Sequence, residues 1–62
     1  MPEYLLIQLP NGKEWEMTAH IAKKLYDFID ERGEKNENLY EYDYENGWLT
    51  QLPPEDQKMV KR

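Results

Sequence analysis

The side chains of this chain with the most chemical potential are its carboxylates. Among 62 residues there are 13 acidic and 8 basic side chains, which gives a formal net charge of −5 at pH 7. Paired carboxylates can perform general acid–base chemistry, but only in a cleft that shifts their pKa values. A domain of this length buries only about 60% of its unfolded surface, which leaves little room for a cleft. The carboxylates therefore predict charge-based recognition and not catalysis.

The other groups that catalysis commonly uses are scarce. The chain has no cysteine and no serine, and its one histidine is His20. The two threonines, Thr18 and Thr50, are assigned structural roles, and the three glycines are scattered instead of forming a phosphate-binding loop. Glu34, Glu37 and Glu41 do not follow the spacing of a calcium-binding loop. We therefore expect no enzyme activity, no metal ion and no cofactor.

The charge and the hydropathy exclude further classes of function. A protein that binds nucleic acid directly is normally basic, because phosphate contacts supply most of its affinity. Residues 1–10 have no basic region and do not resemble a signal peptide, and no apolar run approaches the roughly 18 residues of a membrane span. We expect one small domain over residues 1–62, in the cytoplasm, with no direct contact to nucleic acid or membrane.

The elements that must position the carboxylates begin with a hairpin. Residues 4–9 form an apolar, β-prone run, and residues 13–17 alternate in polarity after an Asn-Gly pair. A two-residue and a three-residue loop differ by one residue of register, which moves every side chain to the other face. The three-residue loop, Pro10-Asn11-Gly12, suits a type I turn and gathers the apolar side chains on one face. These are Leu5, Ile7, Trp15 and Met17.

An amphipathic helix is predicted after this hairpin. Thr18 is in position to cap its N-terminus, and residues 19–32 carry a single apolar stripe. Gly33 stands where a left-handed residue commonly ends a helix. The stripe consists of Ile21, Ala22, Leu25, Phe28 and Ile29.

A second hairpin is predicted over residues 39–52. Tyrosines alternate with acids in its first strand, Glu45-Asn46-Gly47 forms the turn, and residues 48–52 return. The alternation directs one set of side chains to the core, namely Tyr40, Tyr42, Tyr44, Trp48 and Leu52. The two prolines at 53 and 54 then end the strand and open a C-terminal helix of about two turns, with basic residues in its last turn.

Together these elements predict an α+β fold of the order ββαββ with a short C-terminal helix. One long helix packs on a four-stranded, mainly antiparallel sheet. The outer face of that sheet then carries carboxylates with an apolar fringe. Its acids are Glu14, Glu16, Glu41 and Asp43, and its apolar side chains are Tyr4, Leu6 and Leu49. Three further acids, Glu31, Glu34 and Glu37, extend the acidic surface from the end of the helix.

Two interpretations of this outer face are open. Carboxylates two residues apart on a strand are separated by about 6 to 7 Å, which approximates the phosphate spacing of a nucleic-acid strand. Such a surface would bind another protein at a basic, nucleic-acid-binding site, as small acidic inhibitors of the phage or mobile-element type do by DNA mimicry. The other interpretation is a solvated sheet face that keeps the protein soluble.

The strand over residues 4–9 suggests an alternative function. It is apolar and carries no charge, so it would be poorly guarded at the edge of a sheet. Such a strand is either central or pairs across a dimer, with Tyr4 and Leu6 adding to the contact. The alternative is therefore a structural or regulatory subunit that acts as a homodimer or within a larger assembly.

Overall fold

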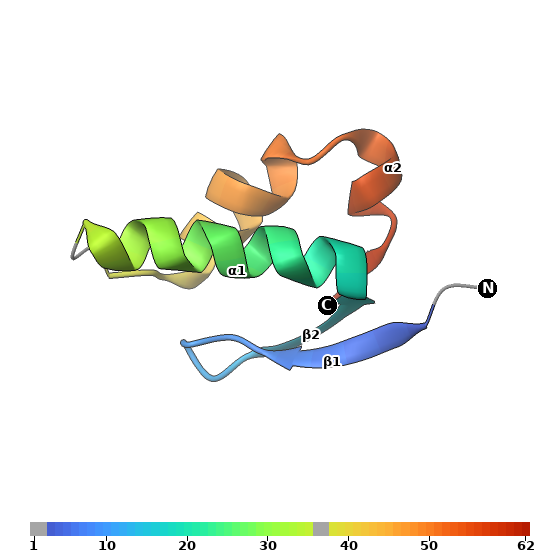
Figure 1. The fold of residues 1–62 in the computed structure, drawn as a ribbon, viewed down its shortest axis with the longest axis horizontal. Helices are drawn as coiled ribbons and strands as arrows, with labels where there is room; N and C mark the ends of the chain where they lie inside the picture. Colours follow the sequence, from blue (N-terminus) through green and yellow to red (C-terminus); the bar gives the residue numbers. More distant parts are fainter. Residues whose placement is uncertain (1–2, 36–37) are drawn as a thin grey trace.

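The protein is described here by a computed structural model, which covers residues 3–35 and 38–62. Its elements, in chain order, are β1 (Tyr4–Gln8), β2 (Glu14–Thr18), the long helix α1 (Ala19–Glu34), the π-helical turn η1 (Asp43–Trp48), the 3₁₀ turn η2 (Leu49–Gln51), α2 (Pro54–Gln57) and β3 (Val60–Lys61). Within the described ranges, the strands form one antiparallel sheet in the order β1-β2-β3. The helical elements lie on one side of the β1–β2 hairpin (Figure 1). The predicted α+β fold is confirmed, and the predicted sheet of four strands is wrong.

The first hairpin has the predicted three-residue loop. Leu9 N donates to the Lys13 carbonyl at 2.7 Å, and Gly12 N donates to the Leu9 carbonyl at 2.9 Å. Gly12 has φ +91°, the left-handed conformation that follows a type I turn in this loop class. The Asn11 side chain supports the turn, because its Oδ1 accepts from Lys13 N at 3.0 Å.

The register of the hairpin follows from this loop. Leu5 is paired with Met17 and Ile7 with Trp15, as predicted. Ile7, Trp15 and Met17 are buried, whereas Leu5 remains 38% exposed at the end of the strand. A shift of one residue would have placed the buried side chains in water, so burial and turn geometry select the same register.

Helix α1 begins as predicted and ends two residues later than predicted. Thr18 Oγ1 accepts from Ile21 N at 3.4 Å and caps the N-terminus. The helix continues through Gly33 to Glu34, so the predicted stop at Gly33 is wrong. Lys35 N still donates to the Arg32 carbonyl at 3.1 Å, which tightens the last turn without a left-handed residue. The apolar stripe faces the sheet, with Ile21, Ala22 and Leu25 buried.

The predicted second hairpin is not formed. Residues 41–51 are helical throughout, as a short helical turn that continues into η1 and η2. Tyr44 is completely buried, whereas Tyr40 and Tyr42 are 65% and 73% exposed. The prediction of a core position is therefore confirmed for Tyr44 and wrong for the other two tyrosines.

The same stretch carries a second spacing that the alternation conceals. Tyr44, Trp48 and Leu52 are four residues apart, and residues at this spacing share one side of a helix. All three are buried, so the helical form still delivers two large aromatic side chains to the core. Asp43 favours it locally, because its Oδ2 accepts from Tyr40 N at 2.9 Å, as an acid in the first turn of a helix does.

An aromatic cluster joins the hairpin to this helical segment. Trp15 lies against Tyr44 and Trp48, with ring centroids 6.3 and 6.4 Å apart. Phe28 of α1 meets the Tyr44 ring edge-on at 6.2 Å. These separations lie in the range of favourable aromatic pairs. The segment from 41 to 52 therefore closes the core in place of the predicted second pair of strands.

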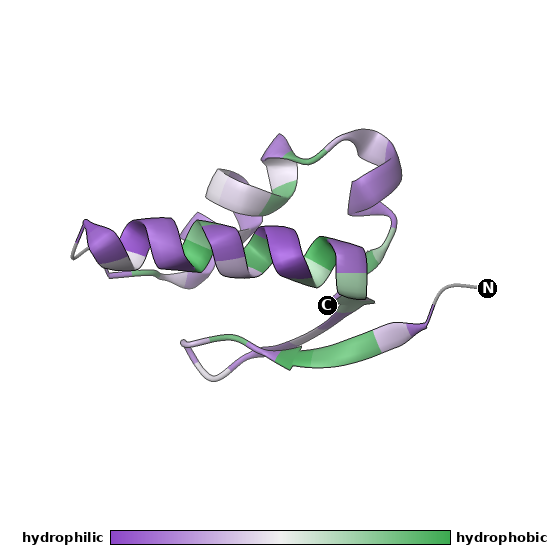
Figure 2. Ribbon diagram, in the orientation of Figure 1, coloured by the Kyte–Doolittle hydropathy of each residue, from purple (hydrophilic) through white to green (hydrophobic). Residues whose placement is uncertain are grey.

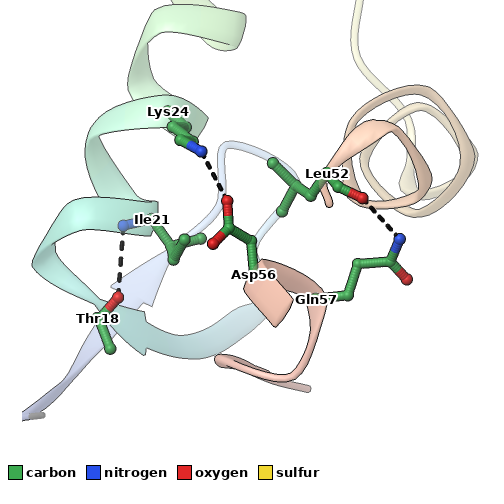
Figure 3. A network of polar contacts seen from close by, with 6 residues as sticks. All are labelled: Thr18, Ile21, Lys24, Leu52, Asp56 and Gln57. Carbon is green, nitrogen blue, oxygen red and sulfur yellow. Dashed lines mark hydrogen bonds and ion pairs between the residues drawn. The ribbon is translucent and has the colours of Figure 1, made fainter. Parts of the chain in front are cut away.

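The C-terminal segment is tied to the rest of the fold by polar contacts (Figure 3). Helix α2 begins at Pro54, as predicted. Lys24 Nζ of α1 donates to Asp56 Oδ2 at 2.6 Å, and Gln57 Nε2 donates to the Leu52 carbonyl at 2.8 Å. The Lys24–Asp56 contact holds α2 beside α1, and the Gln57–Leu52 contact joins α2 to the residues just before it.

The predicted short C-terminal helix is present as α2, but the chain after it forms a strand in place of a second helical turn. Helix α2 has four residues, and Val60 and Lys61 then pair with Met17 and Glu16 of β2. The predicted length of about two turns is therefore wrong. Val60 packs against the core, and this apolar contact together with the free ladder positions of β2 favours a strand over a short, solvent-exposed helix.

Candidate functional site

The outer face of the β1–β2 hairpin is acidic and open to solvent. Along β2, Trp15 and Met17 point into the core, whereas Glu14 and Glu16 point the other way and are exposed. Within residues 3–35 and 38–62 neither of these carboxylates has an ion-pair partner. Leu6, which is opposite Glu16 on β1, is 64% exposed. The structure thus brings together two of the predicted acids and two of the predicted apolar side chains, because Tyr4 shares this face with Leu6.

Strand β3 adds a positive charge to this face that sequence reasoning missed. Lys61 is paired with Glu16 in the β2–β3 ladder, and its Nζ lies 4.4 Å from the centre of the Tyr4 ring. Lys61 forms a cation–π contact here, and the Tyr4 side chain is half-buried. The sequence signal for this strand is the short apolar pair Met59-Val60. These two residues fall within the predicted C-terminal helix, so the strand was missed.

The remaining predicted residues are separated from this face. Glu41 and Asp43 belong to the helical segment, so they do not continue the carboxylate row of β2. Glu41 is exposed, whereas Asp43 is half-buried and caps the turn through Tyr40 N. Leu49 begins η2 and packs against the core. The predicted sheet face with four acids and Leu49 is therefore wrong, because no strand holds these three residues.

Asp43 has a structural role that Glu41 does not share. We expect Asp43→Ala to lower the free energy of unfolding by about 0.5–2 kcal/mol, since Tyr40 N loses its acceptor. Glu41→Ala, in the same turn, should change it by less than about 0.5 kcal/mol. Urea denaturation followed by tryptophan fluorescence measures both variants. Equal losses in the two variants would contradict the capping role.

A second group of acids lies at the C-terminal end of α1. Glu31 and Glu34 are exposed there, and Glu31 Oε1 pairs with Lys35 Nζ at 3.3 Å. Glu37 lies outside the described residues. An open groove beside this end of the helix is lined by Pro10, Ile29, Gly33, Asn38, Leu39 and Tyr40. Residues 38–40 and the last turns of α1 line this groove together, so Glu41 is at the same end of the molecule.

Within the described ranges, the side chains most suited to catalysis lie apart from one another. His20 is exposed in the first turn of α1. In the described part of the chain, no three His, Cys, Asp or Glu side chains are grouped so that they could hold a metal ion. Burial, and secondly the charge of Asp43, raises the pKa of Tyr44 above its ordinary value of about 10. The Tyr44 hydroxyl is inaccessible in the core, so its shifted pKa concerns stability and not chemistry at a surface.

Comparison with known proteins gives no further guide to this surface. A scan against protein-family models, a search of curated proteins and a search of solved structures each found no match to this chain. None of the helices within the described ranges combines the length and the apolarity that a membrane span requires.

Proposed function

We propose that this protein is a non-catalytic binding module that occupies a basic, nucleic-acid-binding surface of another protein. The observation that supports this proposal is the outer face of the hairpin, where Glu14 and Glu16 are exposed beside Leu6 and form no ion pair with the described residues. Their positions, two residues apart on one strand, give a separation of about 6 to 7 Å, which approximates the phosphate spacing of a nucleic-acid strand. The proposal fits a small acidic inhibitor of the phage or mobile-element type that acts in the cytoplasm.

Charge and apolar contact have different roles in this proposal. Exposed carboxylates mainly raise the association rate and set specificity, because their field steers a basic partner. Leu6 and Tyr4 supply apolar area, which slows dissociation once the partner is bound. Lys61 offsets the charge of its ladder neighbour Glu16. We therefore expect the strongest attraction at the Glu14 end of the face.

Charge reversal on β2 tests the proposal. A partner is first captured from a lysate of source cells, with and without competing duplex DNA, and the capture should be lost when DNA is added. The association rate constant of the double variant Glu14→Lys/Glu16→Lys with this partner should then fall more than about tenfold at low salt. Folding should be unaffected, because both side chains are in water.

The matched control is Glu31→Lys/Glu34→Lys, which changes the net charge by the same amount at the end of α1. Its association rate should fall much less, because the altered charges are outside the proposed contact. If the association rate falls equally in the two double variants, it depends on net charge alone and not on the position of the carboxylates. Capture that ignores DNA would exclude the nucleic-acid-mimicking mode of binding.

A homodimeric subunit is the second candidate function. The observation that favours it is the position of β1 at the edge of the described sheet. β1 contains no charged residue, and an unguarded edge strand is prone to pair with another chain.

A further inference from the structure

Strand β1 presents a row of backbone groups that the described fold does not pair. In the described sheet it is bonded to β2 alone. Because Leu9 N donates to the Lys13 carbonyl, every second residue back from Leu9 directs its backbone groups toward β2. By the alternation of an antiparallel ladder, Tyr4, Leu6 and Gln8 direct their N–H and C=O groups away from it. This edge is a ready template for another strand.

The side chains of β1 give this edge little protection. Edge strands commonly carry a lysine, a proline or a bulge that prevents pairing. The five residues of β1 are Tyr, Leu, Leu, Ile and Gln, and they pair with β2 in an unbroken register without a bulge. Leu6, at the centre of the strand, is 64% exposed. Figure 2 shows the middle of β1 in the colour of hydrophobic residues at the rim of the fold.

We propose that β1 pairs with β1 of a second copy of this chain, antiparallel and about a two-fold axis at Leu6. The two three-stranded sheets then join into one continuous sheet. Leu6 meets Leu6 of the second copy, and Tyr4 meets Gln8 of the second copy. Each of these pairs exchanges two backbone hydrogen bonds. Any shift from this register leaves part of the five-residue strand unpaired.

The charges of the outer face fit this register. The two Glu16 positions are separated by three strand spacings of about 4.8 Å, or roughly 14 Å. This separation exceeds the Debye length of about 8 Å at physiological salt, so their repulsion is weak. Opposite charges come closer than this. Glu14 is paired with Gln8 of β1, and Gln8 is paired with Tyr4 of the second copy. In the second copy, Lys61 Nζ lies 4.4 Å from the centre of the Tyr4 ring, so Glu14 of the first copy attracts it. The two-fold axis repeats this attraction between the second Glu14 and the first Lys61.

Sedimentation equilibrium of the full chain gives the first test. We expect a concentration-dependent equilibrium between monomer and dimer. Leu6→Lys sets two ammonium groups against each other at the axis and should raise the dissociation constant more than about tenfold. Tyr42→Lys is the matched control, because Tyr42 is 73% exposed and lies off the sheet. It should leave the equilibrium unchanged, and a wild-type chain that stays monomeric up to millimolar concentration would overturn the proposal.

Single thiols test the register. The chain has no cysteine. Leu6→Cys places two thiols on residues whose Cα atoms are about 5.5 Å apart, within the range of a disulfide. Mild oxidation should therefore give a covalent dimer. Tyr4→Cys and Gln8→Cys should each remain unlinked alone and form a mixed disulfide when combined.

Tyr42→Cys is the control for random collision and should remain unlinked under the same conditions. Failure of Leu6→Cys to cross-link, or equal cross-linking of Tyr42→Cys, would overturn the proposal. Efficient linking of Tyr4→Cys to itself would overturn the register. The dimer rests on the second candidate function, which it specifies, and is independent of the proposed binding to a basic partner, because these measurements contain no other protein. If the chain is monomeric and binds a partner in competition with DNA, the proposed dimer is excluded and the proposed binding function stands.

Discussion

Trp48→Ala should lower the free energy of unfolding by about 3–5 kcal/mol, the range for truncation of a buried aromatic side chain. Trp48 is 5% exposed, and its ring centroid lies 6.4 Å from that of Trp15. A chain of 62 residues has a total stability of only about 3–9 kcal/mol, at about 0.05–0.15 kcal/mol per residue. We therefore expect the variant to lose a large share of its stability and to unfold at a much lower urea concentration than the wild type, as measured by far-ultraviolet circular dichroism and urea denaturation.

Tyr42→Ala is the matched control for this variant, and it also tests the helical form of the segment. Tyr42 is 73% exposed, so its truncation should change the free energy of unfolding by less than about 0.5 kcal/mol. In the hairpin predicted from the alternation, Tyr42 would face the core beside Tyr44 and its loss would be severe. A large loss of stability in Tyr42→Ala would therefore contradict the helical arrangement.

Tyr44→Phe should raise the free energy of unfolding by about 1–3 kcal/mol, the usual cost of an unsatisfied buried polar group. The Tyr44 side chain is completely buried, and its hydroxyl has no hydrogen-bond partner among residues 3–35 and 38–62. Phenylalanine keeps the ring and its edge-on contacts with Trp15 and Phe28. Tyr26→Phe, at a half-exposed position, is the control and should be neutral. A loss of stability in Tyr44→Phe would show that the hydroxyl is satisfied.

Tyr44 also makes stability depend on alkaline pH. Burial, and secondly the charge of Asp43, raises its pKa above the ordinary value of about 10. The folded state therefore holds this proton more tightly than the unfolded chain does. The contribution of this proton to the free energy of unfolding is fully present below about pH 10, the pKa of an unfolded tyrosine. It is lost as the pH rises through the raised pKa of the folded state. Urea midpoints measured across this range should show the loss in the wild type and in Tyr42→Phe, and a smaller loss in Tyr44→Phe.

Parts of the fold that depend on neighbouring residues could be predicted from the sequence. The Pro10-Asn11-Gly12 loop defines a turn of known geometry, and the loop defines the register of β1 against β2. Thr18 and the apolar stripe after it define a helix by capping and by period. The outward positions of Glu14 and Glu16 follow from that register. This part of the candidate surface therefore follows from local chemistry.

The segment from 39 to 52 could not be assigned in this way, because it satisfies two periods at once. Alternation joins Tyr44 to Tyr40 and Tyr42, whereas a spacing of four joins it to Trp48 and Leu52. Both arrangements bury aromatic side chains, and local preference does not separate them. The tertiary structure selects the second, because the core formed by the hairpin and α1 receives Tyr44, Trp48 and Leu52 and leaves the other tyrosines in water.

The same tertiary choice decided which acids share a face. Glu14 and Glu16 occupy a strand whose position the sequence determined, so they remain together beside Leu6. Glu41 and Asp43 occupy a segment whose conformation depends on contacts with distant residues. Because this segment is helical and not a strand, both residues lie elsewhere on the surface than predicted. Lys61 reached the sheet only because the C-terminal segment folds back onto β2. A strand that carries its own turn and register is determined by its sequence, whereas a segment with two competing patterns is determined by the core that it must close.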